Sequence, residues 1–277
     1  MNASQLFEQI KKKRSFLCIG LDSDLNKIPE LLLTKSDPIF EFNKAIIDAT
    51  ASHAVAFKLN SAFYELHGAS GWNSFQKTAK YIHKNYPDVM IIADVKRGDI
   101  ANTAKMYAKT FFQSLDFDAV TLSPYMGHDS IEPFLNYDDK WVIILALTSN
   151  SSFADFQLFE NPTTGRKLFE EVIMKSMHWG TESNTMYVVG ATRSDLLTQV
   201  RNIIPEHFLL VPGVGEQGGS LAQVAKNGMN HRCGLLVNSG RGVIYADNSV
   251  RFAGAAKAAA MLLQREMENL LAEAHLI

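Results

Sequence analysis

The sequence predicts a single-domain (β/α)8 barrel, a TIM barrel of the α/β class, and three observations lead to this prediction. Eight short apolar runs rich in β-branched and aromatic residues recur along the chain. Each run is continuous rather than alternating, which is typical of strands covered on both faces. Eight runs in 277 residues correspond to one strand per roughly 35 residues, the length of a βα unit. No linker or composition shift divides the chain, so we expect one domain over residues 1–277.

The expected strands are the apolar runs themselves. In chain order they are Phe16–Leu21, Ala54–Leu59, Val89–Val95, Ala119–Leu122, Val142–Leu147, Met186–Val189, Phe208–Val211 and Leu235–Val237. Between the fifth and sixth runs, the stretch Asn150–Asn161 is polar, rich in aromatic residues and poorly periodic. We expect this stretch to be a long loop at the mouth of the barrel.

Segments with helical periodicity lie between the runs. One helix face is predicted from Ile39, Phe42, Ile46 and Ile47, and a second from Leu168, Val172 and Ile173. An alanine-rich segment from Ala253 to Leu271 predicts a long helix near the end of the chain.

Composition narrows the function classes. The chain has 27 basic and 29 acidic residues and a pI near 6.4, so it lacks the charge of a nucleic-acid or anionic-membrane binder. No stretch approaches 18 consecutive apolar residues, and no membrane span is expected. The basic block Lys11–Arg14 is interpreted as a solvated helix end rather than part of a secretory signal. Cys18 and Cys233 lie in apolar stretches without metal-ligand spacing, which indicates core thiols in a cytoplasmic protein.

Charged residues at strand ends are the first candidates for chemistry, because the active site of a (β/α)8 barrel lies where its strands end. Asp22 follows the first run, Lys58 lies in the second, and the third ends in Asp94–Asp99, with the sequence D-V-K-R-G-D. Asp94 and Lys96 are two residues apart on a strand, so their side chains should point to the same face. Charges of alternating sign at a buried strand end are costly unless they pair.

Lys58 is expected to join this cluster, because it shares a strand face with Ala54 and Ala56 on the neighbouring strand. A lysine flanked by two carboxylates keeps its proton at neutral pH, since each negative neighbour favours the charged form. Such a lysine is suited to donate a proton and poorly suited to act as a Schiff-base amine. A structural ion-pair cluster or a solvated loop is the alternative interpretation of these charges.

The second candidate is the glycine-rich segment Val211–Gly219, between the seventh run and a predicted helix. Gly213, Gly215 and Gly218 match G-x-G-x-x-G, but a dinucleotide site also needs an acidic residue about 20 residues further on. The eighth run is followed by Asn-Ser-Gly-Arg without an acid, so an NAD site is excluded. Exposed N–H groups in such a loop, with the Arg241 guanidinium, suit a phosphate group. Alternatively, the glycines only form tight turns and Arg241 is a surface cation.

Other candidates carry less information. Thr148 follows the fifth run, where its hydroxyl can contact a ligand or serve in a turn. The eight histidines show no metal-ligand pairing, and no nucleophile elbow supports Ser-His-Asp chemistry. The sequence therefore predicts no metal site.

Four segments together resemble the orotidine 5′-phosphate decarboxylase family, in its longer, second-type branch. They are Phe57–Asn60 (F-K-L-N), Asp94–Thr103 (D-V-K-R-G-D-I-A-N-T), Pro212–Gly219 (P-G-V-G-E-Q-G-G) and Asn238–Gly242 (N-S-G-R-G). The D-x-K-x-x-D core is shared with sugar-phosphate relatives, whereas the longer D-V-K-R-G-D-I-x-N-T pattern is far more specific. Ala101 and Gly240 depart from the family pattern, which has Gly and Ser at these positions.

The resemblance implies a homodimer of (β/α)8 barrels that converts orotidine 5′-monophosphate to UMP, the last step of de novo UMP synthesis, without a metal or organic cofactor. It implies a catalytic tetrad of Lys58, Asp94, Lys96 and Asp99, with Lys96 as the proton donor. Asp99 and Thr103 would reach the partner's site. The resemblance further implies substrate contacts from Asp22, Lys58 and Asn60 to the ribose, from Thr148 to the pyrimidine, and from Gln217, Gly240 and Arg241 to the phosphate.

Two other functions remain open from the sequence. One is a metal-dependent sugar-phosphate decarboxylase or synthase on the same scaffold, which activity in a chelator would distinguish. The other is a catalytically silent protein that binds a nucleotide phosphate, which binding without turnover would support.

Overall fold

The computed structural model describes residues 1–215 and 218–277, apart from the side chain of Ser194. Its parallel strands pair in chain order from β1 to β8, and β8 pairs with β1 to close a barrel. The strands are β1 (Leu17–Gly20), β2 (Ala56–Asn60), β3 (Met90–Arg97), β4 (Ala119–Leu122), β5 (Trp141–Leu147), β6 (Thr185–Val189), β7 (Phe208–Pro212) and β8 (Leu235–Ser239). The predicted (β/α)8 barrel is therefore confirmed.

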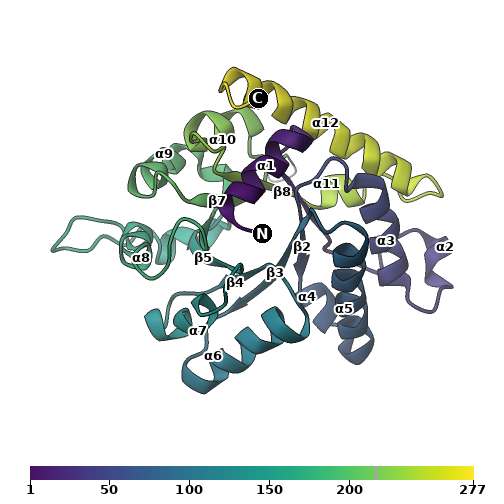
Figure 1. The fold of residues 1–277 in the computed structure, drawn as a ribbon, viewed down its shortest axis with the longest axis horizontal. Coiled ribbons are helices and arrows are strands. Elements are labelled where there is room, and N and C mark those ends of the chain that lie inside the picture. The colour runs from purple at the N-terminus through teal and green to yellow at the C-terminus, as the bar shows by residue number, and fades with distance from the viewer. Residues whose placement is uncertain (216–217) are drawn as a thin grey trace.

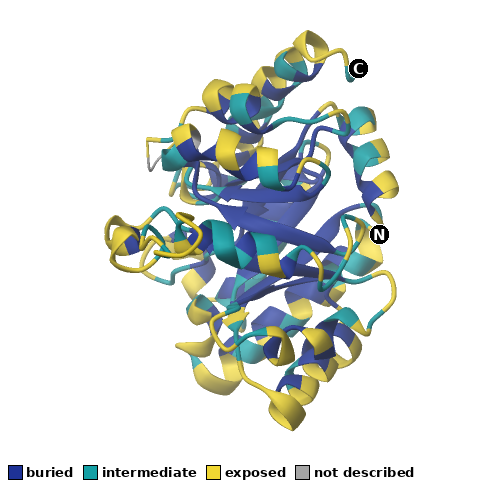
Figure 2. Ribbon diagram, turned by 90° about the vertical axis from the view of Figure 1, so that its left-hand side faces the viewer, coloured by how far each residue is buried: buried dark blue, intermediate teal, exposed yellow. Residues whose placement is uncertain are grey.

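Most of the helices surround the barrel and cover the outer faces of its strands, whereas α1 lies across one end of the barrel (Figure 1). The helices are α1 (Ala3–Lys13), α2 (Glu30–Leu33), α3 (Pro38–Thr50), α4 (Ala62–Glu65), α5 (Gly68–Asn85), α6 (Ala101–Ala108), α7 (Glu132–Leu135), α8 (Leu168–Ser176), α9 (Ser194–Ile203), α10 (Leu221–Gly228), α11 (Arg241–Ile244) and α12 (Phe252–Glu273). The strands are almost wholly buried, whereas the helices present exposed residues on their outer sides (Figure 2). None of the helices in the described residues is long and apolar enough to cross a membrane.

Each expected strand forms, with ends displaced by at most two residues. The displacement is systematic at the carboxyl ends of β2, β3 and β8, which extend beyond the apolar runs into polar residues. Polar side chains are tolerated there because these strand ends border a cavity. In these three strands the apolar run therefore ends before the strand does.

The helix predictions are confirmed in two cases and partly wrong in the third. The α3 face of Ile39, Phe42, Ile46 and Ile47 is buried as expected, and α12 spans the alanine-rich segment. In α8, Ile173 is buried, but Leu168 is 39% exposed and Phe169 takes its place in the core. Positions 169 and 173 are four apart and share one helix face, so the residue before them is rotated away from the barrel.

The stretch Asn150–Asn161 forms an irregular connection between β5 and α8, as predicted. A 3-10 turn at Ser151–Asp155 interrupts it, and Phe153 in this turn is buried. The Arg193 guanidinium lies 4.0 Å from the centre of the Phe153 ring, a cation–π contact that ties this connection to the segment after β6.

Candidate active site

A cavity of about 590 Å³ opens at the carboxyl ends of the strands. Side chains from several strand ends and the loops after them line it: Asp22, Asp24, Lys27, Lys58, Asn60, Phe63, Asp94, Lys96, Thr121, Leu145, Thr148, Ser149, Asn150, Val188, Leu210, Pro212, Val214, Asn238, Ser239, Arg241 and Tyr245, together with Gly213, Gly240 and Gly242. The amino-terminal α1 is packed at the other end of the barrel, where the Trp141 indole at the start of β5 donates to the Met1 carbonyl. The cavity thus lies on the face where (β/α)8 enzymes place their active sites.

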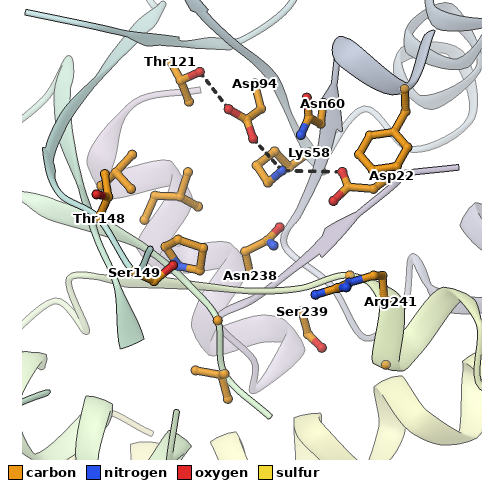
Figure 3. A pocket seen from close by; sticks show the side chains of 18 of the residues that line it. Asp22, Lys58, Asn60, Asp94, Thr121, Thr148, Ser149, Asn238, Ser239 and Arg241 are labelled. Carbon is orange, nitrogen blue, oxygen red and sulfur yellow. Dashed lines mark hydrogen bonds and ion pairs between the residues drawn. The ribbon is translucent and has the colours of Figure 1, made fainter. Parts of the chain in front are cut away.

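Three neighbouring strands bring a carboxylate–lysine array into this cavity (Figure 3). Lys58 Nζ on β2 lies 2.8 Å from Asp94 Oδ2 on β3, and Lys96 Nζ lies 2.6 Å from Asp94 Oδ1. Lys58 Nζ is also 3.8 Å from Asp22 Oδ1, just after β1. The two oxygens of Asp94 therefore each contact a different lysine, and the expected proximity of Lys58, Asp94 and Lys96 is confirmed, with Asp22 as a further neighbour of Lys58.

Burial and opposite charge act against each other in this array. Burial would raise the pKa of Asp94, but the nearby Lys58 and Lys96 ammonium groups outweigh it and hold that pKa well below its usual value. Burial would likewise lower the pKa of Lys58, but Asp94 and Asp22 raise it above its ordinary value. Both groups are therefore charged at neutral pH. The side chain of Lys96 is half-exposed to the cavity and the solvent, in contrast to the buried Lys58.

Thr121 on β4 holds the Asp94 carboxylate, a role that no sequence pattern indicated. Its hydroxyl donates to Asp94 Oδ1 at 3.0 Å and accepts the backbone N–H groups of Val95 and Lys96 at 2.9 and 3.0 Å. The β3–β4 ladder shifts register between Ala93 and Arg97, and Lys96 has a φ of +47°. A left-handed non-glycine residue costs about 1–3 kcal/mol, and such strain is found at functional sites. The buried hydroxyl replaces the ladder acceptors that the irregularity removes.

Asp99 and Thr103 do not join the array in this chain. Both are exposed and neither lines the cavity, and Asp99 Oδ1 accepts the N–H of Ile100 at 2.8 Å. The four charged residues expected as a tetrad therefore do not all meet within one chain. The contribution of Asp99 to a partner's site stays a prediction.

The glycine-rich loop after β7 differs from the expectation of exposed N–H groups. Among its described residues, the N–H groups of Gly215, Gly218 and Gly219 donate to the carbonyls of Gly219, Gly215 and Gly213 at 3.0, 2.8 and 3.2 Å. Gly213, Gly215 and Gly218 have φ values of +97°, +81° and +85°, so the glycines are needed for a tight turn. These three N–H groups close the turn and were wrongly expected to face a ligand, while Gln217 lies outside the described residues.

The remaining predicted binding residues lie around the cavity. Asp22, Asn60, Thr148, Gly240 and Arg241 line it, and Arg241 opens the short α11 after β8. Thr148 and Ser149 lie on one side of the cavity and Arg241 on the opposite side, with Lys58, Asp94 and Asp22 along the edge between them (Figure 3).

Tyr245 is a further cavity residue that sequence reasoning missed. Its hydroxyl donates to the Asp22 carbonyl at 2.8 Å and accepts the Asp24 N–H at 2.7 Å. It thereby ties the segment after β8 to the segment after β1. No local sequence pattern indicated this role.

The two departures from the family pattern have different structural consequences. Ala101 has a φ of +52°, a conformation that favours glycine, so the methyl group is accommodated at a cost in backbone strain. A Cβ built on Gly240 would lie 3.5 Å from the Gly20 carbonyl oxygen and 3.8 Å from Asp22 Oδ2, which are ordinary contacts. The space at Gly240 would therefore admit a serine.

A buried charge array at the carboxyl face of a closed barrel defines a (β/α)8-barrel enzyme. Among the described residues, no group of three His, Cys, Asp or Glu side chains is placed to hold a metal ion. The charged groups that line the cavity are the ammonium groups of Lys27, Lys58 and Lys96, the carboxylates of Asp22, Asp24 and Asp94, and the guanidinium of Arg241.

Comparison with known proteins narrows this class. Residues 15–256 match the family model described as the orotidine 5′-phosphate decarboxylase / HUMPS family. The chain is 58% identical over 273 residues to the orotidine 5′-phosphate decarboxylase of Phocaeicola vulgatus, covering 99% of this chain and all of that protein. The match to the Bacteroides fragilis enzyme of the same name is also 58% over 271 residues, covering 98% of each chain.

Two solved structures are also similar to this chain in fold and sequence. The Leishmania donovani OMP decarboxylase has a TM-score of 0.83 and 34% identity, covering 98% of this chain and 99% of that one. The UMP synthase of the same organism has a TM-score of 0.84 and 36% identity; the match covers 96% of this chain but 55% of that longer chain. The chain belongs to the orotidine 5′-phosphate decarboxylase family.

Proposed function

We propose that this chain converts orotidine 5′-monophosphate to UMP and CO2 as the last step of UMP synthesis, without a metal or organic cofactor, and that Lys96 is the proton donor. The observation that carries the proposal is the Lys58–Asp94–Lys96 array, in which the half-exposed Lys96 ammonium reaches the cavity beside a buried carboxylate. Membership in the family supports the same reaction.

The array suits the charge that this reaction develops. The bond between the pyrimidine ring and its carboxylate breaks, CO2 leaves, and the electron pair remains on the ring carbon. An ammonium group at Lys96 stabilises that charge as it forms and then transfers a proton to the carbon. Lys96 is left neutral and recovers its proton from solvent. Asp94 stays ionised throughout, because Lys58 and Lys96 favour its charged form.

The substrate is oriented in the cavity by its polar ends. Arg241, Gly240 and Gln217 bind the phosphate, Asp22, Lys58 and Asn60 bind the ribose, and the segment at Thr148 faces the pyrimidine. This orientation agrees with the positions of Arg241 and Thr148 on opposite sides of the cavity. Phosphate binding far from the breaking bond contributes free energy for ordering the loops of the site.

The proposal includes a cytoplasmic homodimer in which Asp99 and Thr103 reach the partner's cavity. Exposed apolar side chains next to these residues support it, since they suit a protein interface. They include Ile100 at 39% exposure, Met106 at 46%, Met126 at 52% and Tyr125 at 92%. The segments that carry them are adjacent, because the Ser123 N–H donates to the Arg97 carbonyl at 2.7 Å.

The test is the absorbance of orotidine 5′-monophosphate against time, with purified protein and excess EDTA. Loss of the orotate chromophore together with formation of UMP is the expected result. Activity only on a sugar phosphate with added magnesium would assign the chain to the metal-dependent relatives instead. Binding of UMP without any turnover would refute the catalytic proposal and favour a silent nucleotide-binding protein.

A further inference from the structure

Gln157, in the connection between β5 and α8, makes two hydrogen bonds to the same cavity residue. Its side-chain Oε1 accepts the backbone N–H of Thr148 at 2.8 Å, and its Nε2 donates to Thr148 Oγ1 at 2.7 Å. Thr148 Oγ1 in turn lies 2.5 Å from Asn150 Oδ1. One side-chain amide thus holds both the main chain and the side chain of Thr148, the first residue after β5.

The directions of these hydrogen bonds follow from the chemistry of their atoms. A backbone N–H can only donate, so the Gln157 atom that faces it must be the carbonyl oxygen. The amide nitrogen of Gln157 then faces the Thr148 hydroxyl and donates to it. The Thr148 hydroxyl consequently gives its own proton to Asn150 Oδ1. Gln157 therefore fixes the orientation of the Thr148 hydroxyl and of the Thr148 backbone N–H.

The backbone of Gln157 is itself held on both sides. Its N–H donates to the Phe153 carbonyl at 2.9 Å, and its carbonyl accepts the N–H of Phe169 at 3.1 Å. Phe153 and Phe169 are both buried. Gln157 is thereby fixed between the 3-10 turn and the start of α8, and its side chain reaches back to β5.

We infer that Gln157 is a positioning residue that holds the Thr148–Ser149 segment in place for the pyrimidine ring, an inference that rests on the proposed function. Thr148 and Ser149 lie on the side of the cavity opposite Arg241 (Figure 3). With the phosphate at Arg241, the base end of the substrate faces this segment. Gln157 does not line the cavity and acts through Thr148.

A pair of ligands that differ only in the base tests this inference. UMP carries both the base and the phosphate, whereas ribose 5-phosphate lacks the base. Gln157→Met keeps the length of the side chain and removes both hydrogen bonds to Thr148. The variant should bind UMP about tenfold more weakly, a loss of the size expected for one to two hydrogen bonds, and raise KM for orotidine 5′-monophosphate similarly. Its inhibition constant for ribose 5-phosphate should equal that of the wild type.

Three variants complete the design. Gln157→Glu keeps an acceptor for the Thr148 N–H but cannot donate to Oγ1, so it should lie between wild type and Gln157→Met. In a double-mutant cycle, Thr148→Val should weaken UMP binding by itself and add little to Gln157→Met, because the two residues act through shared bonds. Asp155→Asn, an exposed change in the same connection, should match the wild type for both ligands.

The outcomes separate this inference from the proposed function. A wild-type protein that does not decarboxylate orotidine 5′-monophosphate refutes the proposed function, whatever the variants do. An active wild type with Gln157→Met unchanged for UMP refutes the positioning role. Equal weakening of UMP and ribose 5-phosphate by Gln157→Met also refutes it, because a general structural defect would then explain the loss.

Discussion

His207 lies directly before β7, outside the residues that line the cavity, and is 7% exposed. Within the described part of the chain, neither of its ring nitrogens has a hydrogen-bond partner, and its ring packs edge-on against Tyr187 at 5.6 Å. Burial lowers the pKa of His207 from 6.5 to about 4, and the net effect of the surrounding charges is smaller. Those charges are Glu182 and Glu206, which raise the pKa, and Arg201 and Arg232, which lower it. His207 is therefore neutral in the folded protein at pH values where it is protonated in the unfolded chain.

This difference makes stability depend on pH in one direction. Between pH 6.5 and 4 the unfolded chain binds the proton and the folded protein does not, so the stability contributed by the neutral imidazole is present above pH 6.5 and is lost as the pH falls. The two pKa values give a loss of about 2 kcal/mol in the free energy of unfolding between pH 7 and pH 5. His207→Phe keeps the aromatic contact with Tyr187 and removes the titrating group.

Equilibrium urea unfolding at one protein concentration, at pH 7, 6, 5.5 and 5, measures the effect. The wild type should lose about 2 kcal/mol more than His207→Phe over this range, while both keep the same activity at pH 7. The exposed His178→Gln variant should follow the wild type and serves as the control. Parallel pH dependence in the wild type and His207→Phe would refute the reasoning, because it would show that His207 accepts a proton equally well in the folded and unfolded states.

Further predictions concern the site and its departures from the family pattern. Lys96→Ala should lower kcat by at least about 10³-fold and retain UMP binding, and a kcat near that of the wild type would exclude Lys96 as proton donor. Arg241→Ala should raise KM about 10–100-fold with a smaller change in kcat, whereas Arg251→Ala, at an exposed arginine, should leave KM unchanged. An unchanged KM in Arg241→Ala would show that Arg241 does not bind the phosphate. Mixing inactive Asp99→Ala with inactive Lys96→Ala subunits should restore part of the activity, and no recovery after verified subunit exchange contradicts a shared site. Ala101→Gly removes the backbone strain of an alanine in the left-handed region and should raise Tm by about 2 °C in a thermal scan. An equal or lower Tm would show that the φ of +52° at Ala101 costs little stability.

The fold was predictable because the strands of a parallel barrel correspond to continuous apolar runs in the sequence. Both faces of each strand are buried, so every run stood out without alternation. Because the strands were predicted from apolar residues alone, the polar residues Asn60, Asn238 and Ser239 were not assigned to them. These residues end their strands and face the cavity rather than the core. The face of α8 was misassigned because Leu168 and Phe169 are both apolar, and only packing against the barrel selects Phe169.

The charge array was predictable in part because strand periodicity places residues two apart on one face. Asp94 and Lys96 do meet, but the strand between them is irregular, and Lys96 reaches Asp94 from a left-handed conformation. Thr121 supports this conformation from a strand 27 residues away in sequence. No local pattern marks Thr121, and the same is true of Tyr245, whose partners also lie in another segment, and of Gln157, whose partner Thr148 lies at the start of the same connection. Residues that hold a site through such contacts become visible only once the barrel brings the strands together.

The site divides into two parts that respond differently to substitution. Lys58, Asp94 and Thr121 come from adjacent strands β2, β3 and β4, their side chains are buried, and Lys58 and Thr121 each donate to Asp94. Removing one leaves a buried charge or hydrogen-bonding group without its partner, so substitutions there should alter both stability and chemistry. Arg241 and Gln157 come from segments outside the strands, where a change weakens contacts to one end of the substrate and leaves the array intact. We therefore expect kcat to depend on the strand residues and KM on the loop residues, because the barrel fixes the reacting groups while the loops hold the substrate against them.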